Sequence, residues 1–175
     1  MQSRKTRQAT PSAYPLVPLS LVLILIFWGC ASASAPGQTA QESAKPPNIE
    51  NRLRAAGRVW QRTPHRMGGH DRRGIDCSGL TQVLFKELFG IQLPRTTGQQ
   101  VLKGKPVNRK ALAAGDLLFF RPPGKKRHVG IYLGQGEFLH TSTHRGVMIS
   151  RLEEYYWRHC YWTARRVLTP DLISN

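Results

Sequence analysis

Hydrophobic residues in the first half of the segment from residue 49 to residue 168 follow a helical period. Between residues 49 and 60 they recur at three- and four-residue intervals, which predicts an amphipathic helix with Asn48 as its N-cap. A second helix is predicted to begin at Cys77, directly after Asp76, whose side chain suits the N-cap position. Apolar residues continue at helical spacing from there, and Gly90 is expected to end this helix.

The second half of the segment changes to short apolar runs bounded by turn residues, a pattern typical of strands. Strands are predicted at residues 117–120, 129–133, 137–141, 147–150 and 163–168. The turn Gly134-Gln135-Gly136 joins the second and third of them as a hairpin. Helices followed by mostly hairpin-linked strands indicate an α+β domain with an antiparallel sheet. We expect this domain to cover residues 49–168, with an irregular stretch at 64–74 and a polar tail at 169–175.

The N-terminus of the 175-residue chain has the order of a secretory signal peptide. Arg4, Lys5 and Arg7 precede an almost uninterrupted apolar run of 13 residues at 16–28, and small residues follow. The run is shorter than the roughly 20 residues that a membrane-spanning helix needs. Residues 1–29 are therefore predicted to be a signal peptide, and the mature chain is predicted to be exported.

Cys30 comes directly after this run, a position that resembles the lipobox of bacterial lipoproteins. In that motif the cysteine is lipidated and becomes the first residue of the mature protein. Phe27 and Trp28 depart from the usual pattern, and cleavage after Ala33 would instead give a soluble periplasmic or secreted protein. We expect lipidation at Cys30, and Ala31 after it implies delivery to the outer membrane of a Gram-negative cell, facing the periplasm.

Residues 30–48 are rich in Ala, Ser, Gln and Pro and show neither aromatic residues nor an apolar period. Such a composition predicts a flexible tether, which would let a lipid-anchored domain reach away from the membrane.

The chain is strongly basic, with a formal net charge of +16. This charge favours a polyanionic neighbour, such as nucleic acid, an anionic membrane face or an acidic cell-wall polymer, although it also fits a merely solvated surface. Export and the lack of a nucleic-acid-binding motif argue against nucleic acid.

Cys77, His128 and His140 have the placement that a cysteine hydrolase requires. Cys77 would lie at a helix N-terminus, where unpaired N–H groups and the helix dipole lower the pKa of a thiol. His128 begins one predicted strand and His140 ends the next, so the hairpin would place the two imidazoles side by side. The three residues are therefore candidates for a nucleophile, its general base and the group that orients the base.

The cysteines allow two other interpretations. A zinc site built from the same three residues is chemically possible, but the chain offers no companion thiol or HxxxH pair. Three cysteines also give no disulfide framework. Cys160 is expected to be buried and inert among Trp157, Tyr161 and Trp162, without a disulfide to Cys77.

Six short motifs occur in a fixed order along the predicted domain. They lie at residues 64–69, 74–80, 93–97, 115–120, 128–134 and 138–140, and read PHRMGG, GIDCSGL, LPRTT, GDLLFF, HVGIYLG and FLH. Together they resemble the NlpC-type cell-wall cysteine peptidases, close to the lipoprotein murein endopeptidases of Gram-negative bacteria. The resemblance implies a papain-like fold that hydrolyses peptide bonds in peptidoglycan stem peptides or cross-links, without a metal or an organic cofactor. It also implies that Cys77 is the nucleophile, His128 the general base and His140 the residue that orients the base.

One residue departs from the family's pattern. Similar proteins carry a tyrosine, thought to support the oxyanion, where this chain has His65. We expect the N–H group of His65 to take over that role. Arg95, Arg66 and Arg72 are candidates for binding substrate carboxylates, although they are equally consistent with solvated surface groups.

Two further functions stay open at this point. One is a catalytically silent lipoprotein that binds cell wall or another polyanion. The other keeps the nucleophile but transfers the acyl group elsewhere, as amidases and acyltransferases do. The motifs do not identify the scissile bond, and loops such as residues 121–127 would decide it.

Overall fold

The computed structural model describes residues 48–124 and 126–169. The predicted signal peptide at 1–29, Cys30 and all of the tether except Asn48 lie outside the described residues, as does the tail from residue 170 onward.

The two predicted helices are present with the expected ends. Helix α1 (Ile49–Trp60) begins after Asn48, whose side chain accepts a hydrogen bond from the backbone N–H of Asn51 at 2.8 Å. Helix α2 (Cys77–Phe89) begins after Asp76, which accepts the N–H of Gly79 at 2.7 Å. It ends at Gly90, which has the left-handed φ of 68° that favours glycine at this position.

A six-stranded sheet, in which every strand pair is antiparallel, has the order β3-β8-β4-β5-β6-β7. The strands are β3 (Lys105–Val107), β4 (Leu117–Phe120), β5 (His128–Gly134), β6 (Glu137–Ser142), β7 (Gly146–Arg151) and β8 (Tyr161–Arg166). All five predicted strands are found. The last begins and ends two residues earlier than predicted, and Leu168 after it belongs to the buried core.

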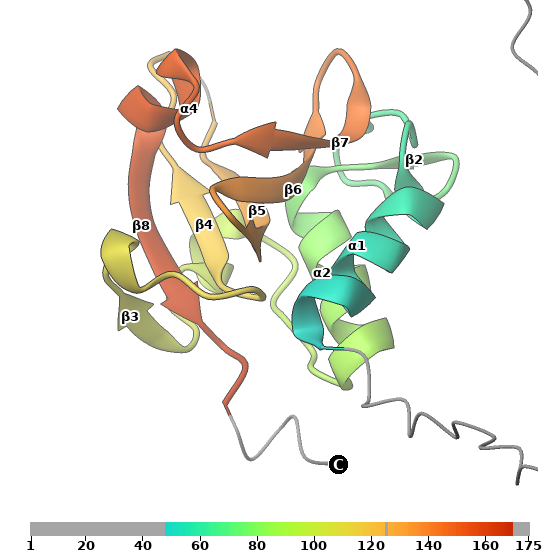
Figure 1. Cartoon of the computed structure of the whole chain (residues 1–175). Helices are drawn as coiled ribbons and strands as arrows, with labels where there is room; N and C mark the ends of the chain where they lie inside the picture. The colour runs from blue at the N-terminus through green and yellow to red at the C-terminus, as the bar shows by residue number, and fades with distance from the viewer. Residues whose placement is uncertain (1–47, 125, 170–175) are drawn as a thin grey trace, which may run out of the picture. The chain divides into compact units, whose positions relative to one another are not determined.

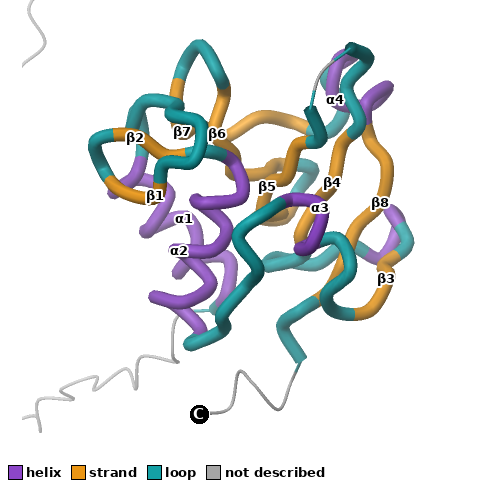
Figure 2. Tube along the Cα trace, turned by 180° about the vertical axis from the view of Figure 1, so that it is seen from behind, coloured by secondary structure: helices purple, strands orange, loops and turns teal. Residues whose placement is uncertain are grey.

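Helices α1 and α2 lie together on one face of the sheet, and helix α4 (Tyr155–Cys160) lies away from them, near one end of β8 (Figures 1 and 2). Alternation along the strands assigns side chains to the two faces. Val129 and Ile131 of β5 join the core beneath α1 and α2, whereas Phe120 and Phe138 pack with Trp157 of α4. The sheet is therefore covered on both faces. This explains why β4, buried at every position, reads as a continuous apolar run.

The sequence did not predict the shortest elements. These are helix α3 (Thr97–Gln100), the 3-10 turn η1 (Arg109–Ala111), α4, β3 and the hairpin of β1 (His70–Asp71) and β2 (Gly74–Ile75). Each is too short to show a period, and the small hairpin means that residues 64–74 are not wholly irregular as expected. None of the helices among the described residues is long and apolar enough to cross a membrane.

Cys160 is buried and free, as predicted, and packs with Trp157 and Tyr161. The prediction that Trp162 also packs against Cys160 is wrong. Alternation along β8 directs the Trp162 side chain to the other face of the sheet, where it packs against the core beneath α1 and α2. Cys77 is also free, so the structure contains no Cys77–Cys160 disulfide.

Candidate active site

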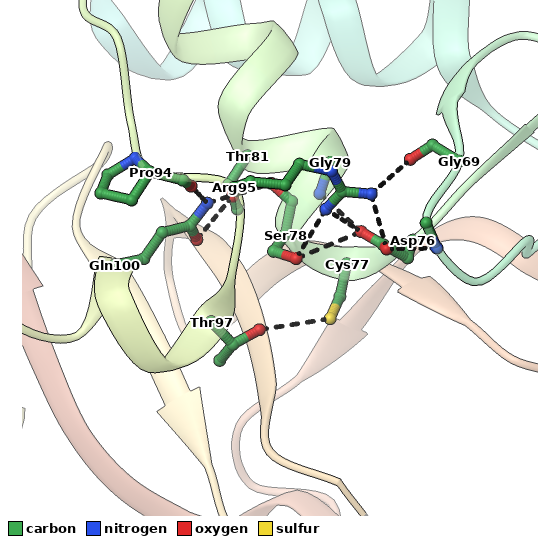
Figure 3. A network of polar contacts seen from close by, with 11 residues as sticks. Gly69, Asp76, Cys77, Ser78, Gly79, Thr81, Pro94, Arg95, Thr97 and Gln100 are labelled. Atoms are coloured by element: carbon green, nitrogen blue, oxygen red, sulfur yellow. Dashed lines mark hydrogen bonds and ion pairs between the residues drawn. The ribbon is translucent and has the colours of Figure 1, made fainter.

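Cys77 is the first residue of α2, and its Sγ atom lies 3.8 Å from the hydroxyl oxygen of Thr97 on α3 (Figure 3). Burial raises the pKa of the Cys77 thiol, and the carboxylate of Asp76 adds to this effect. Hydrogen bonds from Thr97 and from the backbone of Val129 and Ser78 oppose the rise without cancelling it. The sequence argument for a lowered pKa was therefore wrong, because desolvation outweighs the favourable helix terminus. In the free protein at neutral pH, Cys77 is a protonated thiol.

The side chains of His128 and His140 lie next to each other, as predicted from the hairpin between their strands. Nε2 of His128 lies 3.1 Å from Nδ1 of His140, and Nε2 of His140 lies 3.0 Å from the hydroxyl of Ser150 on β7. If each Nε2 carries the proton, His128 donates to His140 and His140 donates to Ser150. Nδ1 of His128 is then free to accept a proton. Ser150 was missed by the sequence analysis, since nothing local marks a serine whose partner lies on the neighbouring strand.

Burial also determines the charge of the imidazole pair. It lowers the pKa of His128 to about 4, with a further contribution from the electrostatic interaction with His65. Burial together with the charge of His128 lowers the pKa of His140 to about 3. At neutral pH both rings are uncharged, so the site holds a neutral thiol and a neutral base rather than an ion pair.

An aromatic enclosure accounts for this desolvation. Trp157 of α4 stacks on His128 with ring centres 5.4 Å apart and meets His140 edge-on at 4.8 Å. Phe138 stacks on the His140 ring at 4.9 Å. The rings are thus fixed in orientation and shielded from water. The sequence placed Trp157 near Cys160 but did not connect it with the histidines.

Asp76 and Arg95 form a second network at the start of α2 (Figure 3). The guanidinium donates to both carboxylate oxygens of Asp76 at 2.9 and 2.8 Å, and also to the hydroxyl of Ser78 and the carbonyl of Gly69. Burial alone raises the pKa of Asp76, but Arg95 and two backbone N–H donors outweigh it, and the net pKa is lowered. Arg95 therefore fixes the helix start, and Asp76 already neutralises its charge.

The other two arginines that were candidates for substrate binding lie elsewhere. Arg72 contacts the carbonyl of Val59 and stacks on Trp60 at 4.8 Å. Neither Arg72 nor Arg66 is among the described residues that line the two pockets around Cys77.

Two pockets open on either side of Cys77. The histidine pocket, of about 440 Å³, is the one that contains His128 and His140, and the threonine pocket, of about 620 Å³, is the one that contains Thr96 and Thr97. Five residues line both pockets, namely His65, Met67, Cys77, Lys126 and Arg127. A chain lying across this boundary would extend into a pocket on each side of the thiol, with His65 beside the reacting group.

Among the described residues, no group of three or more His, Cys, Asp and Glu side chains is placed to hold a metal ion. Both ring nitrogens of His140 are already engaged by His128 and Ser150. The donor set therefore does not fit a zinc site formed by Cys77, His128 and His140.

A thiol at a helix start, beside two linked imidazoles held by an antiparallel sheet, is the arrangement expected of a papain-like cysteine hydrolase. Residues 62–166 match the NlpC/P60 family, and the chain belongs to this family. The predicted α+β, papain-like fold is confirmed.

Two relatives bear the names of endopeptidases, and one of these names specifies murein. A probable endopeptidase NlpC homolog from Haemophilus influenzae is 49% identical over 109 residues, which cover 62% of this chain and 58% of the relative. The murein DD-endopeptidase MepS/murein LD-carboxypeptidase of Escherichia coli is 45% identical over 122 residues, which cover 70% and 65%. The matched part of this chain therefore spans less than two thirds of the length of either relative.

One solved structure with the same fold is described as non-catalytic. RipD from Mycobacterium tuberculosis is described as a non-catalytic NlpC/p60 domain protein adapted to a peptidoglycan-binding function. It superimposes with a TM-score of 0.57 at 26% identity and covers 70% of this chain and 99% of RipD. The fold is therefore compatible with both a catalytic and a binding role.

Proposed function

We propose that this protein is a cysteine peptidase that hydrolyses peptide bonds in peptidoglycan stem peptides or cross-links. The observation that carries the proposal is that Cys77 and the linked pair His128 and His140 line one pocket. The names of the two relatives supply the reaction class, and the name of the Escherichia coli relative supplies murein as the substrate class.

The reaction is an acyl transfer in two steps. Nδ1 of His128 takes the proton of the Cys77 thiol as the sulfur attacks the amide carbonyl carbon, and His140 holds the imidazole in the required tautomer. Backbone N–H groups at the start of α2 stabilise the oxyanion. The carbon–nitrogen bond breaks, and His128 gives the proton to the leaving amine. Water then attacks the thioester, His128 accepts a proton from it, and the carbon–sulfur bond breaks to restore the thiol.

His65 is proposed to donate a hydrogen bond to the same oxyanion, since it lines both pockets next to Cys77. Replacing it with phenylalanine is expected to lower kcat by about 10²-fold, the usual cost of removing one oxyanion donor. His65→Tyr, which restores a hydroxyl donor, should recover most of the rate. Equal kcat for His65→Phe and wild type, measured on the same peptide, would remove His65 from the mechanism.

We further propose that the chain is made with a lipoprotein signal peptide at residues 1–29 and anchored through Cys30 to the outer membrane. The tether at 30–48 would then carry the catalytic domain at 49–168, followed by the tail at 169–175. In cells of a Gram-negative host, labelled palmitate should be incorporated into the full chain and not into Cys30→Ser. Labelling of neither protein, with processing after Ala33, would point instead to a soluble periplasmic or secreted enzyme.

A catalytically silent wall-binding protein is the second candidate function. It is favoured by the same fold in the non-catalytic RipD and by the replacement of the expected tyrosine with His65. The basic net charge, +16 for the whole chain and +13 without Arg4, Lys5 and Arg7 of the proposed signal peptide, would serve binding to an anionic polymer.

The deciding experiment incubates purified peptidoglycan sacculi with the full-length protein and with its Cys77→Ala variant. New amino termini that form only with the wild type, identified by mass spectrometry, would establish the peptidase and the bond that it cuts. If neither protein releases fragments and both sediment with the sacculi, the binding function replaces our proposal.

The lowered pKa of His128 predicts an unusual acid limit for activity. The base must be uncharged in the free enzyme, and its pKa of about 4 keeps it so well below the usual histidine range. We therefore expect kcat/KM to stay level down to about pH 5 and to fall below it. NMR titration of the His128 ring protons gives the same pKa without interference from substrate carboxylates. A pKa near 6.5 in that titration would contradict the prediction.

A further inference from the structure

We infer that Lys126 and Arg127 form a binding site for a substrate carboxylate, carried by the carbon atom next to the leaving amine. The inference rests on the proposed peptidase function and deepens it, because it specifies that a preferred substrate carries a carboxylate next to the scissile bond.

The first observation is position. Lys126 and Arg127 lie in the loop between β4 and β5, and they are the only lysine and arginine side chains among the described residues that line both pockets. Nη1 of Arg127 lies 4.0 Å from the place that a Cβ atom at Gly98 would occupy, so its side chain reaches from the start of β5 across to α3. A group held by these two residues would lie beside Cys77 rather than at a distant end of the substrate.

The second observation is charge. Asp76 is the only acidic residue among the described residues lining either pocket, and Arg95 already pairs with both of its oxygens. Within the described residues, no carboxylate pairs with Lys126 or Arg127, and both side chains are exposed.

Arg127 is also partly ordered before any substrate arrives. Its guanidinium lies 5.0 Å from the centre of the Trp162 ring, and Arg121 stacks on the same ring at 3.4 Å. A guanidinium held over an aromatic ring loses less freedom when it binds a carboxylate through two parallel hydrogen bonds.

The side of the scissile bond is part of the inference. Lys126 and Arg127 line the histidine pocket together with His128, which in the proposed reaction gives its proton to the leaving nitrogen. We therefore place the bound carboxylate on the amine side of the bond. In peptidoglycan stems, a diaminopimelate residue acylated at a cross-link carries a carboxylate on that very carbon. The D-glutamyl-diaminopimelate bond within a longer stem carries an amide there instead.

The test uses two synthetic peptides that span a D-alanyl-diaminopimelate cross-link and differ at one group. The carboxyl group on the carbon next to the scissile nitrogen is free in one peptide and a primary amide in the other. We expect the full-length wild type to prefer the acid by about 10-fold or more in kcat/KM, mainly through KM. The double variant Lys126→Gln/Arg127→Gln should lose this preference to within about twofold, because its contacts to the carboxylate are gone.

Arg121→Gln is the matched control. It removes one positive charge from the same loop and from the same tryptophan, but Arg121 lines neither pocket. It should keep the preference for the acid. An equal rate of the wild type on both peptides, or an unchanged preference in the double variant, would overturn the inference.

Binding of the two peptides to the full-length Cys77→Ala variant, measured by calorimetry, separates this inference from the proposed function. A preference for the acid that disappears when Lys126→Gln and Arg127→Gln are added supports the carboxylate site even if no peptide is ever cleaved. Equal affinity for both peptides overturns the site even if the sacculi are cleaved.

Discussion

Replacing His128 with glutamine is expected to lower kcat on a peptidoglycan peptide by about 10²–10⁴-fold. Burial raises the pKa of Cys77, so the thiol does not ionise by itself at neutral pH and needs a base in the transition state. Glutamine keeps similar volume and a hydrogen-bonding group opposite His140, but it cannot accept the proton. We expect the loss in kcat with little change in KM, because the proposed role of His128 is on the reacting atoms rather than on the bound ground state.

The control for this variant is His70→Gln, which changes an exposed histidine on β1 that lines neither pocket around Cys77. It should keep the wild-type rate, and the thermal unfolding of both variants should stay close to that of the wild type. If His128→Gln kept more than about a tenth of the wild-type kcat, His128 would not be the base.

Local signals were sufficient to place the three candidate residues. Asn48 and Asp76 cap the helices that they were predicted to cap, because capping depends on a side chain and a backbone N–H only three residues apart. The turn between β5 and β6 uses positive φ angles at Gly134, Gln135 and Gly136, and its length fixes which residues of the two strands face each other. The closeness of His128 and His140 follows from that register.

The surroundings of these three residues could not be predicted from the sequence. Trp157 reaches His128 only because α4, a helix too short to show a period, folds back over the sheet. Ser150 meets His140 across a strand pair whose partner comes ten residues later in the chain. The pKa of Cys77 was misjudged for the same reason, since desolvation depends on everything that packs around the thiol and not on the helix that it begins.

Replacing Arg95 with methionine is expected to lower the free energy of unfolding by about 2–4 kcal/mol at pH 7, near the range for breaking a buried ion pair. The side chain of Asp76 is only 9% exposed while that of Arg95 is 36% exposed, so the loss falls mainly on the carboxylate left without its partner. Arg95→Lys keeps the charge but not the paired hydrogen bonds, and its free energy of unfolding should lie between those of Arg95→Met and the wild type.

The effect of Arg95→Met on stability should depend on pH with a definite sign. In the wild type the pKa of Asp76 is lowered, so its contribution to stability is complete above the unfolded pKa of about 4 and is lost as the pH falls through the lower folded value. Without Arg95, the pKa of Asp76 is higher than in the wild type, because burial is opposed only by the two backbone N–H donors, and protonation relieves the unpaired charge. The difference between wild type and variant should therefore shrink as the pH is lowered from 7 toward 4, as measured by urea unfolding. Arg73→Met, which breaks the exposed pair with Asp71, should leave the stability unchanged throughout. A difference for Arg95→Met that stayed constant over this pH range would mean that the lost stability comes from packing and not from the charge of Asp76.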